Sequence, residues 1–251
     1  MSQQPGKFVW FEHRSNDIPS ATAFYEELFG WRTDQMPMSD GQTYPVIMNG
    51  DAGIGGYAEV PNGTPNQWLS FLSVDDVDAS YKAAVAAGAK SLMAPCDYGS
   101  AGRSATLADP TGGVFALWKG AQGDPPESTS PPAGGWLWNE LTTQDDAAAV
   151  AFYEKVFGYV DDAKPMPQGT YHVLKQGDSM RAGVMKAMDA SMPTMWLQYV
   201  AVADCDASSK KAQGLGAHIV VPPTDIPEIG RFAVFIDPLG AALAVMKPAA
   251  G

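Results

Sequence analysis

The chain contains two copies of one sequence pattern, displaced from each other by 128 residues. AFYEELFGW at 23–31 returns as AFYEKVFGY at 151–159, and WLSFLSVDDVDAS at 68–80 returns as WLQYVAVADCDAS at 196–208. A third match at this offset joins ADPTGGVFALWK at 108–119 to IDPLGAALAVMK at 236–247. Self-similarity at a fixed offset indicates that one structural unit has been duplicated. We therefore expect two similar domains related by a pseudo-twofold axis, in which each site has a counterpart.

A linker separates the two copies. The segment 120–135, GAQGDPPESTSPPAGG, is rich in Pro, Gly and Ser and nearly free of large apolar residues, which is typical of linkers. This composition predicts a first domain over 1–119, a linker over 120–135 and a second domain over 136–251.

Each copy is predicted to run twice through the order strand, helix, three strands. The aromatic stretch 8–14 is typical of a strand, and apolar residues at helical spacing follow until Gly30 ends the predicted helix. Three short extended stretches complete the first run, near 31–36, 44–48 and 52–60. The second run is predicted as a strand, a helix and three strands at 68–74, 76–87, 89–93, 103–108 and 114–119.

Two short motifs in this pattern resemble a known family. Asp17, then Phe24-Tyr25 and Leu28-Phe29-Gly30, resemble the D…FY…LG signature of the vicinal oxygen chelate superfamily, and the DPTG and DPLG turns at 109–112 and 237–240 resemble its DPxG turn. That superfamily comprises glyoxalase I, bleomycin-resistance proteins, fosfomycin-resistance proteins and extradiol dioxygenases. The resemblance implies an α+β fold of tandem glyoxalase-like domains, with four βαβββ modules whose curled mixed sheets enclose cavities.

The chain is further similar to an actinomycete subgroup of this family. The doubled acidic form, with W-x-E on the first strand of each copy, is shared with proteins described as a 27 kDa antigen or a hydroxylase. Some members of that subgroup lie in anthracycline gene clusters.

The resemblance also implies positions for a divalent metal, and the residues there are unsuited to one. Family enzymes hold the metal with His and Glu, which are ordinary ligands for such ions. The matching positions carry no ligand side chain: Trp10, Leu69, Ala116, Trp138, Leu197 and Ala244, with Gly55-Gly56 and Val184-Met185 at the loosely aligned fourth strand. We therefore expect no metal ligands and no cofactor, which argues against metal-dependent dioxygenase or glyoxalase chemistry.

The strand faces that would carry the metal are predicted to carry aromatic residues and a glutamate instead. Alternation along a strand puts Trp10 and Glu12 on one face in the first copy, and Trp138 and Glu140 in the second. Aromatic walls bind planar apolar molecules by stacking, and a carboxylate among them can pair with an amine. The predicted ligand-binding residues are Trp10, Glu12, Tyr57, Phe71, Trp118, Trp138, Glu140, Tyr171, His172, Met185, Tyr199 and Met246.

Alternatives stay open for these residues. The tryptophans could be plain core, since aromatic residues dominate cores as well as binding sites. A buried glutamate needs a ligand, water or a basic partner, and Arg103 or Arg231 are candidates for the partner; the glutamates could also lie at exposed strand ends. Glu12 and Glu140 are the candidate catalytic residues if the protein is an enzyme.

Charge and composition exclude several function classes. Sixteen basic and 28 acidic residues leave a net charge of −12, which argues against a nucleic-acid partner. No apolar span is long enough to cross a membrane, and the N-terminal residues do not resemble a secretory signal. The unmatched Cys96 and Cys205 predict neither a disulfide framework nor a thiolate metal site. We expect a cytoplasmic protein, monomeric or homodimeric.

The leading hypothesis is metal-independent binding or sequestration of a planar aromatic, cationic natural product, in antibiotic resistance or as an accessory to biosynthesis. Its partner would be a small-molecule aromatic ligand, with a biosynthetic enzyme as a second partner. The alternative is an enzyme, a lyase or an oxygenase-like accessory protein, using Glu12 or Glu140 as base or as a relocated metal ligand. A third is a secreted or surface antigen without a small ligand.

Overall fold

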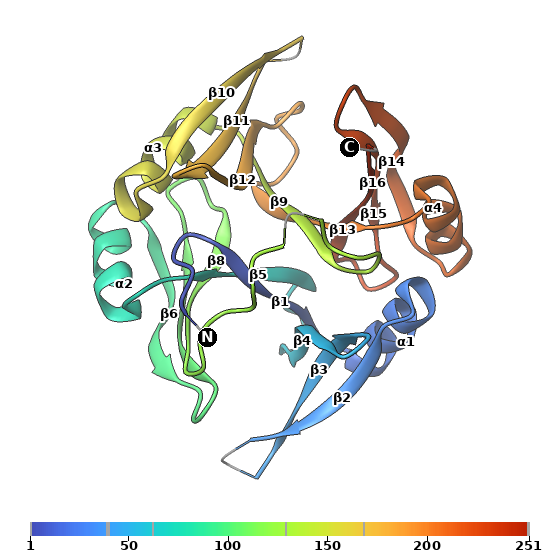
Figure 1. Cartoon of the computed structure of the whole chain (residues 1–251), viewed down its shortest axis with the longest axis horizontal. Coiled ribbons are helices and arrows are strands. Elements are labelled where there is room, and N and C mark those ends of the chain that lie inside the picture. The colour runs from blue at the N-terminus through green and yellow to red at the C-terminus, as the bar shows by residue number, and fades with distance from the viewer. Residues whose placement is uncertain (1, 39–40, 62, 129, 168, 250–251) are drawn as a thin grey trace. The chain divides into compact units, whose positions relative to one another are not determined.

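The computed structural model describes residues 2–38, 41–61, 63–128, 130–167 and 169–249. Both halves follow the predicted order of strand, helix and three strands, run through twice (Figure 1). The elements of the first half are β1 Phe8–Ser15, α1 Ile18–Phe29, β2 Arg32–Pro37, β3 Thr43–Asn49, β4 Ala52–Glu59, β5 Gln67–Ser73, α2 Val77–Ala86, β6 Lys90–Asp97, β7 Gly102–Ala108 and β8 Val114–Gly120.

The second half repeats these elements. They are β9 Trp136–Thr143, α3 Asp146–Phe157, β10 Val160–Met166, β11 Gly169–Gln176, β12 Ser179–Lys186, β13 Met195–Ala201, α4 Cys205–Gly214, β14 His218–Ile226, β15 Gly230–Ile236 and β16 Ala242–Pro248. The predicted α+β class with tandem βαβββ modules is confirmed.

Helix boundaries follow from capping residues in the sequence. The Asp17 side chain accepts a hydrogen bond from the Ser20 amide at the start of α1, and Gly30 ends the helix in the left-handed conformation with φ 72°. Asp145 and Gly158 do the same for α3. An acidic N-cap satisfies an amide that the helix leaves unpaired, and glycine adopts positive φ without steric cost.

Each half contributes one open, mixed eight-stranded sheet. The strand orders are β2-β3-β4-β1-β5-β8-β7-β6 and β10-β11-β12-β9-β13-β16-β15-β14, so the topology of the second sheet repeats that of the first. The strand pairs β1–β4 and β5–β8 are parallel, as are β12–β9 and β13–β16, and the hairpin pairs are antiparallel.

Compact packing divides the chain into two units that each combine segments of both halves. Unit 1 comprises 1–10, 69–127 and 138–196, and unit 2 comprises 11–68, 128–137 and 197–251. Within unit 1, α2 contacts α3, and within unit 2, α1 contacts α4 (Figure 1).

The two family motifs bind each other inside each unit. In unit 1, the Tyr153 hydroxyl donates a hydrogen bond to Asp109 Oδ2 over 2.9 Å; in unit 2, Tyr25 donates to Asp237 Oδ2 over 2.8 Å. Each aspartate is buried, and its other oxygen accepts backbone N–H groups of its own turn. The FY helix and the DPxG turn of the other half thus stabilise each other through buried hydrogen bonds.

Unit 2 adds a histidine to this network. His13 is completely buried, and its Nε2 lies 3.0 Å from Asp237 Oδ2. Its repeat counterpart in unit 1 is Leu141, which is also completely buried. His13 thus lies in the core against α1, where its ring also contacts that of Tyr25 with 5.4 Å between the centroids.

The segment between the halves is partly tied to the strands. Asp124 is buried and accepts hydrogen bonds from the Ser73 hydroxyl and the Gln4 amide, and Glu127 pairs with Arg181 at 2.9 Å. In the described part of the chain, no helix combines the length and apolar character needed to span a bilayer.

Candidate functional site

A hydrogen-bonded set of three side chains occupies the first module of the second half, in unit 1. Glu140 on β9 is 7% exposed and accepts a hydrogen bond from the Tyr171 hydroxyl on β11, with 2.8 Å between the oxygens. The Trp138 indole N–H in turn donates to the Tyr171 oxygen over 2.8 Å. A buried carboxylate is costly unless it accepts hydrogen bonds, so the tyrosine both satisfies Glu140 and is held in one orientation.

The same arrangement occurs in unit 2. Glu12 on β1 is 8% exposed and accepts a hydrogen bond from the Tyr44 hydroxyl on β3 over 2.8 Å. Its other oxygen accepts from Arg14 Nε over 3.1 Å. Each half of the duplicated chain therefore contains a buried glutamate–tyrosine pair.

A glycine on the neighbouring strand makes room for each tyrosine. Gly183 pairs with Glu140 and Gly56 pairs with Glu12 in the strand register. A Cβ atom on Gly183 would lie 2.0 Å from the Tyr171 hydroxyl oxygen, and one on Gly56 would lie 2.2 Å from that of Tyr44. Non-bonded atoms do not approach so closely, so no other residue type fits there without displacing the tyrosine.

Burial keeps the Tyr171 hydroxyl protonated. Desolvation raises the pKa of Tyr171 well above its usual value, and the adjacent Glu140 raises this pKa further through its charge and the hydrogen bond. At neutral pH the group is therefore a hydrogen-bond donor to Glu140. Its hydroxyl is engaged at the sheet, and its ring is the part available to a ligand.

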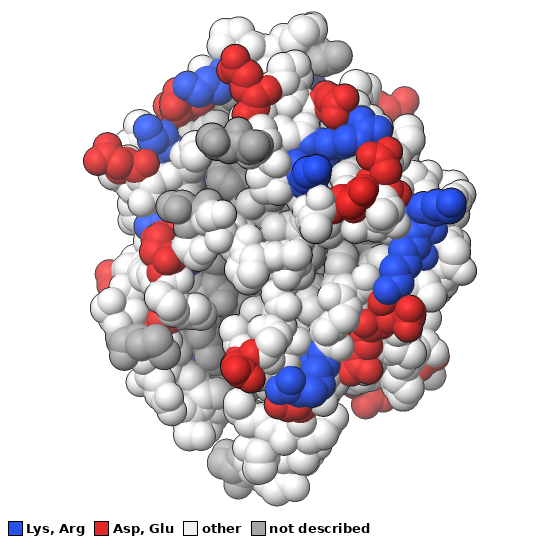
Figure 2. All heavy atoms as spheres, turned by 45° about the vertical axis from the view of Figure 1, so that its right-hand side comes forward, with Lys and Arg blue, Asp and Glu red and all other residues white. Residues whose placement is uncertain are grey.

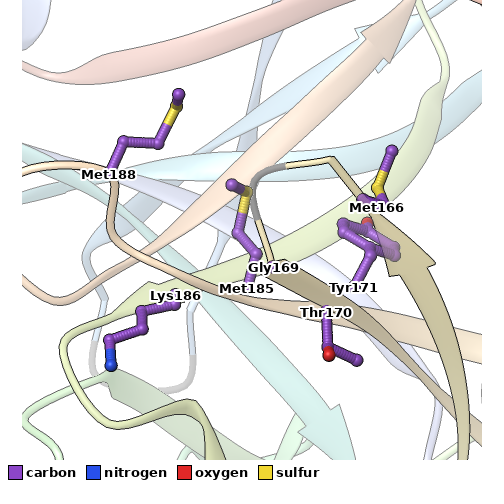
Figure 3. Close-up of a pocket in the computed structure, with 7 residues that line it drawn as sticks. All are labelled: Met166, Gly169, Thr170, Tyr171, Met185, Lys186 and Met188. Carbon is purple, nitrogen blue, oxygen red and sulfur yellow. The ribbon is translucent and has the colours of Figure 1, made fainter.

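A pocket of about 50 Å³ opens beside Tyr171 (Figure 3). Three methionines line it: Met166 from β10, Met185 from β12 and Met188 from the loop that follows β12. Lys186 also lines the pocket, but its side chain extends away from those methionines (Figure 3). The pocket is lined by Met166, Gly169, Thr170, Tyr171, Met185, Lys186 and Met188.

Two residues predicted to line the pockets lie on the other sheet face. In the strand register Tyr57 pairs with His13 and His172 pairs with Val184, one position out of phase with the glutamates. The Tyr57 ring contacts the His13 ring, with 6.0 Å between ring centroids. Burial raises the pKa of the Tyr57 hydroxyl. His172 lies between Asp161, 2.7 Å from its Nδ1, and Asp146, 3.6 Å from its Nε2. The structure thus separates both from the face that carries the glutamate–tyrosine pairs.

The remaining predicted aromatic residues pack within each unit. In unit 1, Trp10 and Trp118 pack against a small apolar cluster of Leu69, Phe71 and Ala116. In unit 2, Tyr199 and Met246 are nearly completely buried, and the Tyr199 ring lies 6.3 Å from that of Phe232. Whether any of these residues binds a ligand stays a prediction.

The predicted basic partners of the glutamates were wrong. Arg103 pairs with Asp78 and Asp97, and the repeat-related Arg231 pairs with Asp206 and Asp225, at 2.7–3.0 Å. Glu12 pairs with Arg14 because residues two apart on one strand share a face. Figure 2 likewise shows acidic and basic side chains lying side by side on the face in view.

The residues at the family's metal positions do not fit a divalent ion. Ala116 and Leu69 are fully buried in the apolar cluster with Trp10, and the Trp138 indole donates to Tyr171. None of these side chains offers the imidazole, carboxylate or thiolate donors that such ions require. In the described part of the chain, no three His, Cys, Asp or Glu side chains come close enough to form a metal site.

A chelation experiment tests this conclusion. The purified protein is expected to retain no stoichiometric divalent ion after dialysis, and EDTA is expected to leave its Tm unchanged, because a metal bound to the native state would raise Tm. Elemental analysis and thermal unfolding with and without EDTA are the measurements. Nickel, iron, manganese or zinc at one equivalent per chain would contradict it.

The sequence interpretation missed several residues that shape the site. Gly183, Met166, Met188 and Tyr44 were not among the predicted ligand-binding residues, and Gly56 entered only as a fourth-strand position without a metal ligand. A signal was present: Tyr44 with Tyr171 and Gly56 with Gly183 repeat at an offset of 127, one less than the motifs on either side.

Comparisons with known proteins agree with this architecture. The model of the Glyoxalase/Bleomycin resistance protein/Dioxygenase superfamily matches residues 7–117 and 137–245. Putative glyoxylase CFP32 of Mycobacterium bovis and Mycobacterium tuberculosis is 37% identical over 247 residues, covering 96% of this chain and 94% of that protein. Anthracycline biosynthesis protein DnrV of Streptomyces peucetius is 30% identical, covering 97% of this chain and 94% of that protein.

Solved structures show the same fold at low sequence identity. The Mn(II)-bound glyoxalase from Novosphingobium aromaticivorans has a TM-score of 0.68 at 14% identity, over 98% of this chain and 83% of that one. Homoprotocatechuate 2,3-dioxygenase from Arthrobacter globiformis also has a TM-score of 0.68 at 14% identity, over 98% and 82% of the two chains. With family matches in both halves, the chain belongs to the Glyoxalase/Bleomycin resistance protein/Dioxygenase superfamily.

Proposed function

We propose that this protein binds a planar aromatic small molecule, without a metal, against the ring of Tyr171. The observation that carries the proposal is the pocket at Tyr171, which three methionines from different segments line together with an aromatic ring whose hydroxyl is fixed by Trp138 and Glu140. A ring held in one orientation before binding loses little conformational entropy when a ligand stacks on it.

The methionines supply an adaptable apolar rim. Thioether side chains are flexible and polarizable, and they contact aromatic rings favourably. Met166 and Met188 are 46% and 72% exposed, so they can move to cover a ligand larger than the pocket itself. The relationship to a protein named for anthracycline biosynthesis supports a polycyclic aromatic ligand, since anthracyclines are planar and fused.

A cationic ligand would gain from the charge of the whole protein. The net charge of −12 attracts cations at long range and raises their association rate at low ionic strength. Glu12 and Glu140 contribute to this field, but neither lines the pocket at Tyr171, and each accepts a tyrosine hydrogen bond. We therefore propose that charge steers the ligand and that stacking holds it.

Substitution of Met188 tests the site without disturbing the core. Met188→Ala is expected to weaken binding of doxorubicin about 2- to 10-fold, the range expected for one sulfur–aromatic contact. Met180→Ala is the matched control, because Met180 is 64% exposed and does not line the pocket. Affinity is measured by quenching of tryptophan fluorescence, with the neutral doxorubicin aglycone as a second ligand to isolate the charge effect. Equal affinities of both variants and the wild type would place the ligand elsewhere.

A second candidate function is a lyase that uses Glu140 as general base. It is favoured by the 37% identity to a protein named as a glyoxylase and by the burial of Glu140. Incubation with the hemithioacetal of methylglyoxal and a small thiol distinguishes the two functions: turnover that is lost in Glu140→Gln would support the lyase, and stoichiometric doxorubicin binding without turnover supports the binder.

A further inference from the structure

The two copies of the glutamate–tyrosine pair differ at one point beside the glutamate. Two residues after Glu12 stands Arg14, and two residues after Glu140 stands Thr142. Both lie on the glutamate's face of the strand, since side chains alternate along it. Arg14 is bound to Glu12 Oε1 through its Nε at 3.1 Å, whereas Thr142 is buried and uncharged.

On the neighbouring strand, the side chain opposite the long Arg14 is short and the side chain opposite the short Thr142 is long. Arg14 pairs in register with Ala58, and Thr142 pairs with Met185. The large residue is thus on the first strand of the first half, β1, and on the fourth strand of the second half, β12. Each copy combines one long and one short side chain at this pair of positions, as volume-conserving exchange in a packed region requires.

This exchange of long and short side chains affects the space beside Tyr171 and beside Tyr44 differently. In unit 1 the long side chain is Met185, which lines the pocket beside Tyr171. In unit 2 the long side chain is Arg14, whose guanidinium is drawn back onto Glu12 beside Tyr44. An ion pair that is half-buried against a sheet is displaced only at the cost of leaving a buried carboxylate without its charged partner.

We infer that the duplicated site has one open and one closed copy, and that the pairs Thr142/Met185 and Arg14/Ala58 decide which is which. The copy in unit 1 takes the aromatic ligand, and the copy in unit 2 is a structural ion pair. The identity of the ligand in this inference rests on the proposed function. The difference in packing between the two copies does not depend on any ligand.

Calorimetric titration with doxorubicin tests the ligand part. We expect one molecule bound per chain, at least a tenfold loss of affinity in Thr142→Arg, and no change in Arg14→Thr. Two equivalent sites per chain, or a loss in Arg14→Thr with none in Thr142→Arg, would overturn the inference. Absence of doxorubicin binding to the wild type would instead count against the proposed function, and the packing experiment then decides the inference alone.

Two double-mutant cycles, read out by urea unfolding, test the packing part without a ligand. Thr142→Arg is expected to lower the urea midpoint, because Met185 fills the space that the arginine needs, and adding Met185→Ala is expected to raise the midpoint again. The reciprocal cycle in unit 2 combines Ala58→Met, which overpacks against Arg14, with Arg14→Thr, which relieves it. If Thr142→Arg does not fold, the second cycle is sufficient. Strictly additive effects would overturn the inference.

Discussion

Gly183→Ala is expected to destabilise the protein by about 2–4 kcal/mol, and to lower Tm by about 5–15 °C for a chain of this size. The new Cβ would meet the Tyr171 hydroxyl oxygen at 2.0 Å. Tyr171 must then leave its place, which breaks its hydrogen bonds with Trp138 and Glu140 and removes one hydrogen bond from a buried carboxylate. Urea and thermal unfolding give the stability, and loss of doxorubicin binding is expected with it.

Two matched variants show whether the tyrosine is the cause. Gly56→Ala meets the Tyr44 hydroxyl at 2.2 Å and is expected to cost a similar amount, whereas Gly214→Ala at the end of α4 meets no atom within 4 Å. The latter is expected to be neutral or to stabilise by up to about 1 kcal/mol, since alanine is the better helix former. A Gly183→Ala variant as stable as Gly214→Ala would show that the glutamate–tyrosine pair contributes nothing to the fold.

Asp237→Ala is expected to cost about 3–5 kcal/mol at pH 7, because it removes one carboxylate that serves several buried donors at once. Asp237 accepts hydrogen bonds from the Tyr25 hydroxyl and from the Leu239 and Ala241 amides, and it faces His13 Nε2 at 3.0 Å. Without it, the tyrosine hydroxyl and two turn amides lose their acceptor. Urea unfolding gives the free energy of unfolding of wild type and variant.

The same carboxylate gives stability a defined pH dependence. Burial alone would raise the pKa of Asp237, but the hydrogen bond and charge of His13, with the Ala241 amide and the Tyr25 hydroxyl, hold it below 3.8. A carboxyl whose pKa is lowered by folding stabilises the native state above its unfolded pKa and loses that contribution as pH falls through the folded pKa. The stability difference between wild type and Asp237→Asn is therefore expected to shrink as the pH falls below about pH 4.

The duplication supplies an internal control for His13. Asp109 has the same tyrosine and turn contacts, but Leu141 stands where unit 2 has His13. His13→Leu is therefore expected to cost less than Asp237→Ala, since the aspartate keeps its other donors. An equal loss in both variants would mean that the histidine contact dominates the network.

The order of elements could be predicted because it depends on local rules. Aspartate at the start of α1 and Gly30 at its end are capping signals readable from neighbouring residues, and they recur at α3. The alternation that placed Trp138 and Glu140 on one face is equally local. Three matches at one offset then extended each conclusion to the other half.

For strands distant from these motifs, the sheet face on which each residue lies could not be predicted in the same way. From the start of β2 to the end of β3 the first half spans 32–49, and from the start of β10 to the end of β11 the second half spans 160–176, which is one residue fewer. The repeat offset therefore changes from 128 to 127 before Tyr171 and Gly183. A shift of one residue exchanges the two faces of a strand. Tyr57 and His172 were predicted to bind the ligand without a strand-face argument, and their register partners His13 and Val184 place them on the face away from the glutamates.

The sequence by itself determined that the chain is a duplicated α+β protein of this superfamily, that its metal positions lack donors, and that a glutamate stands on the first strand of each half. These are properties of residue types and of spacings along one strand or helix. Only the tertiary structure decided that each glutamate is satisfied by a tyrosine two strands away and that a glycine opposite makes room for it. It also decided that methionines from three segments line one pocket together with Tyr171. Those contacts depend on strand order and register, which are set by packing across the sheet rather than by neighbours in the chain.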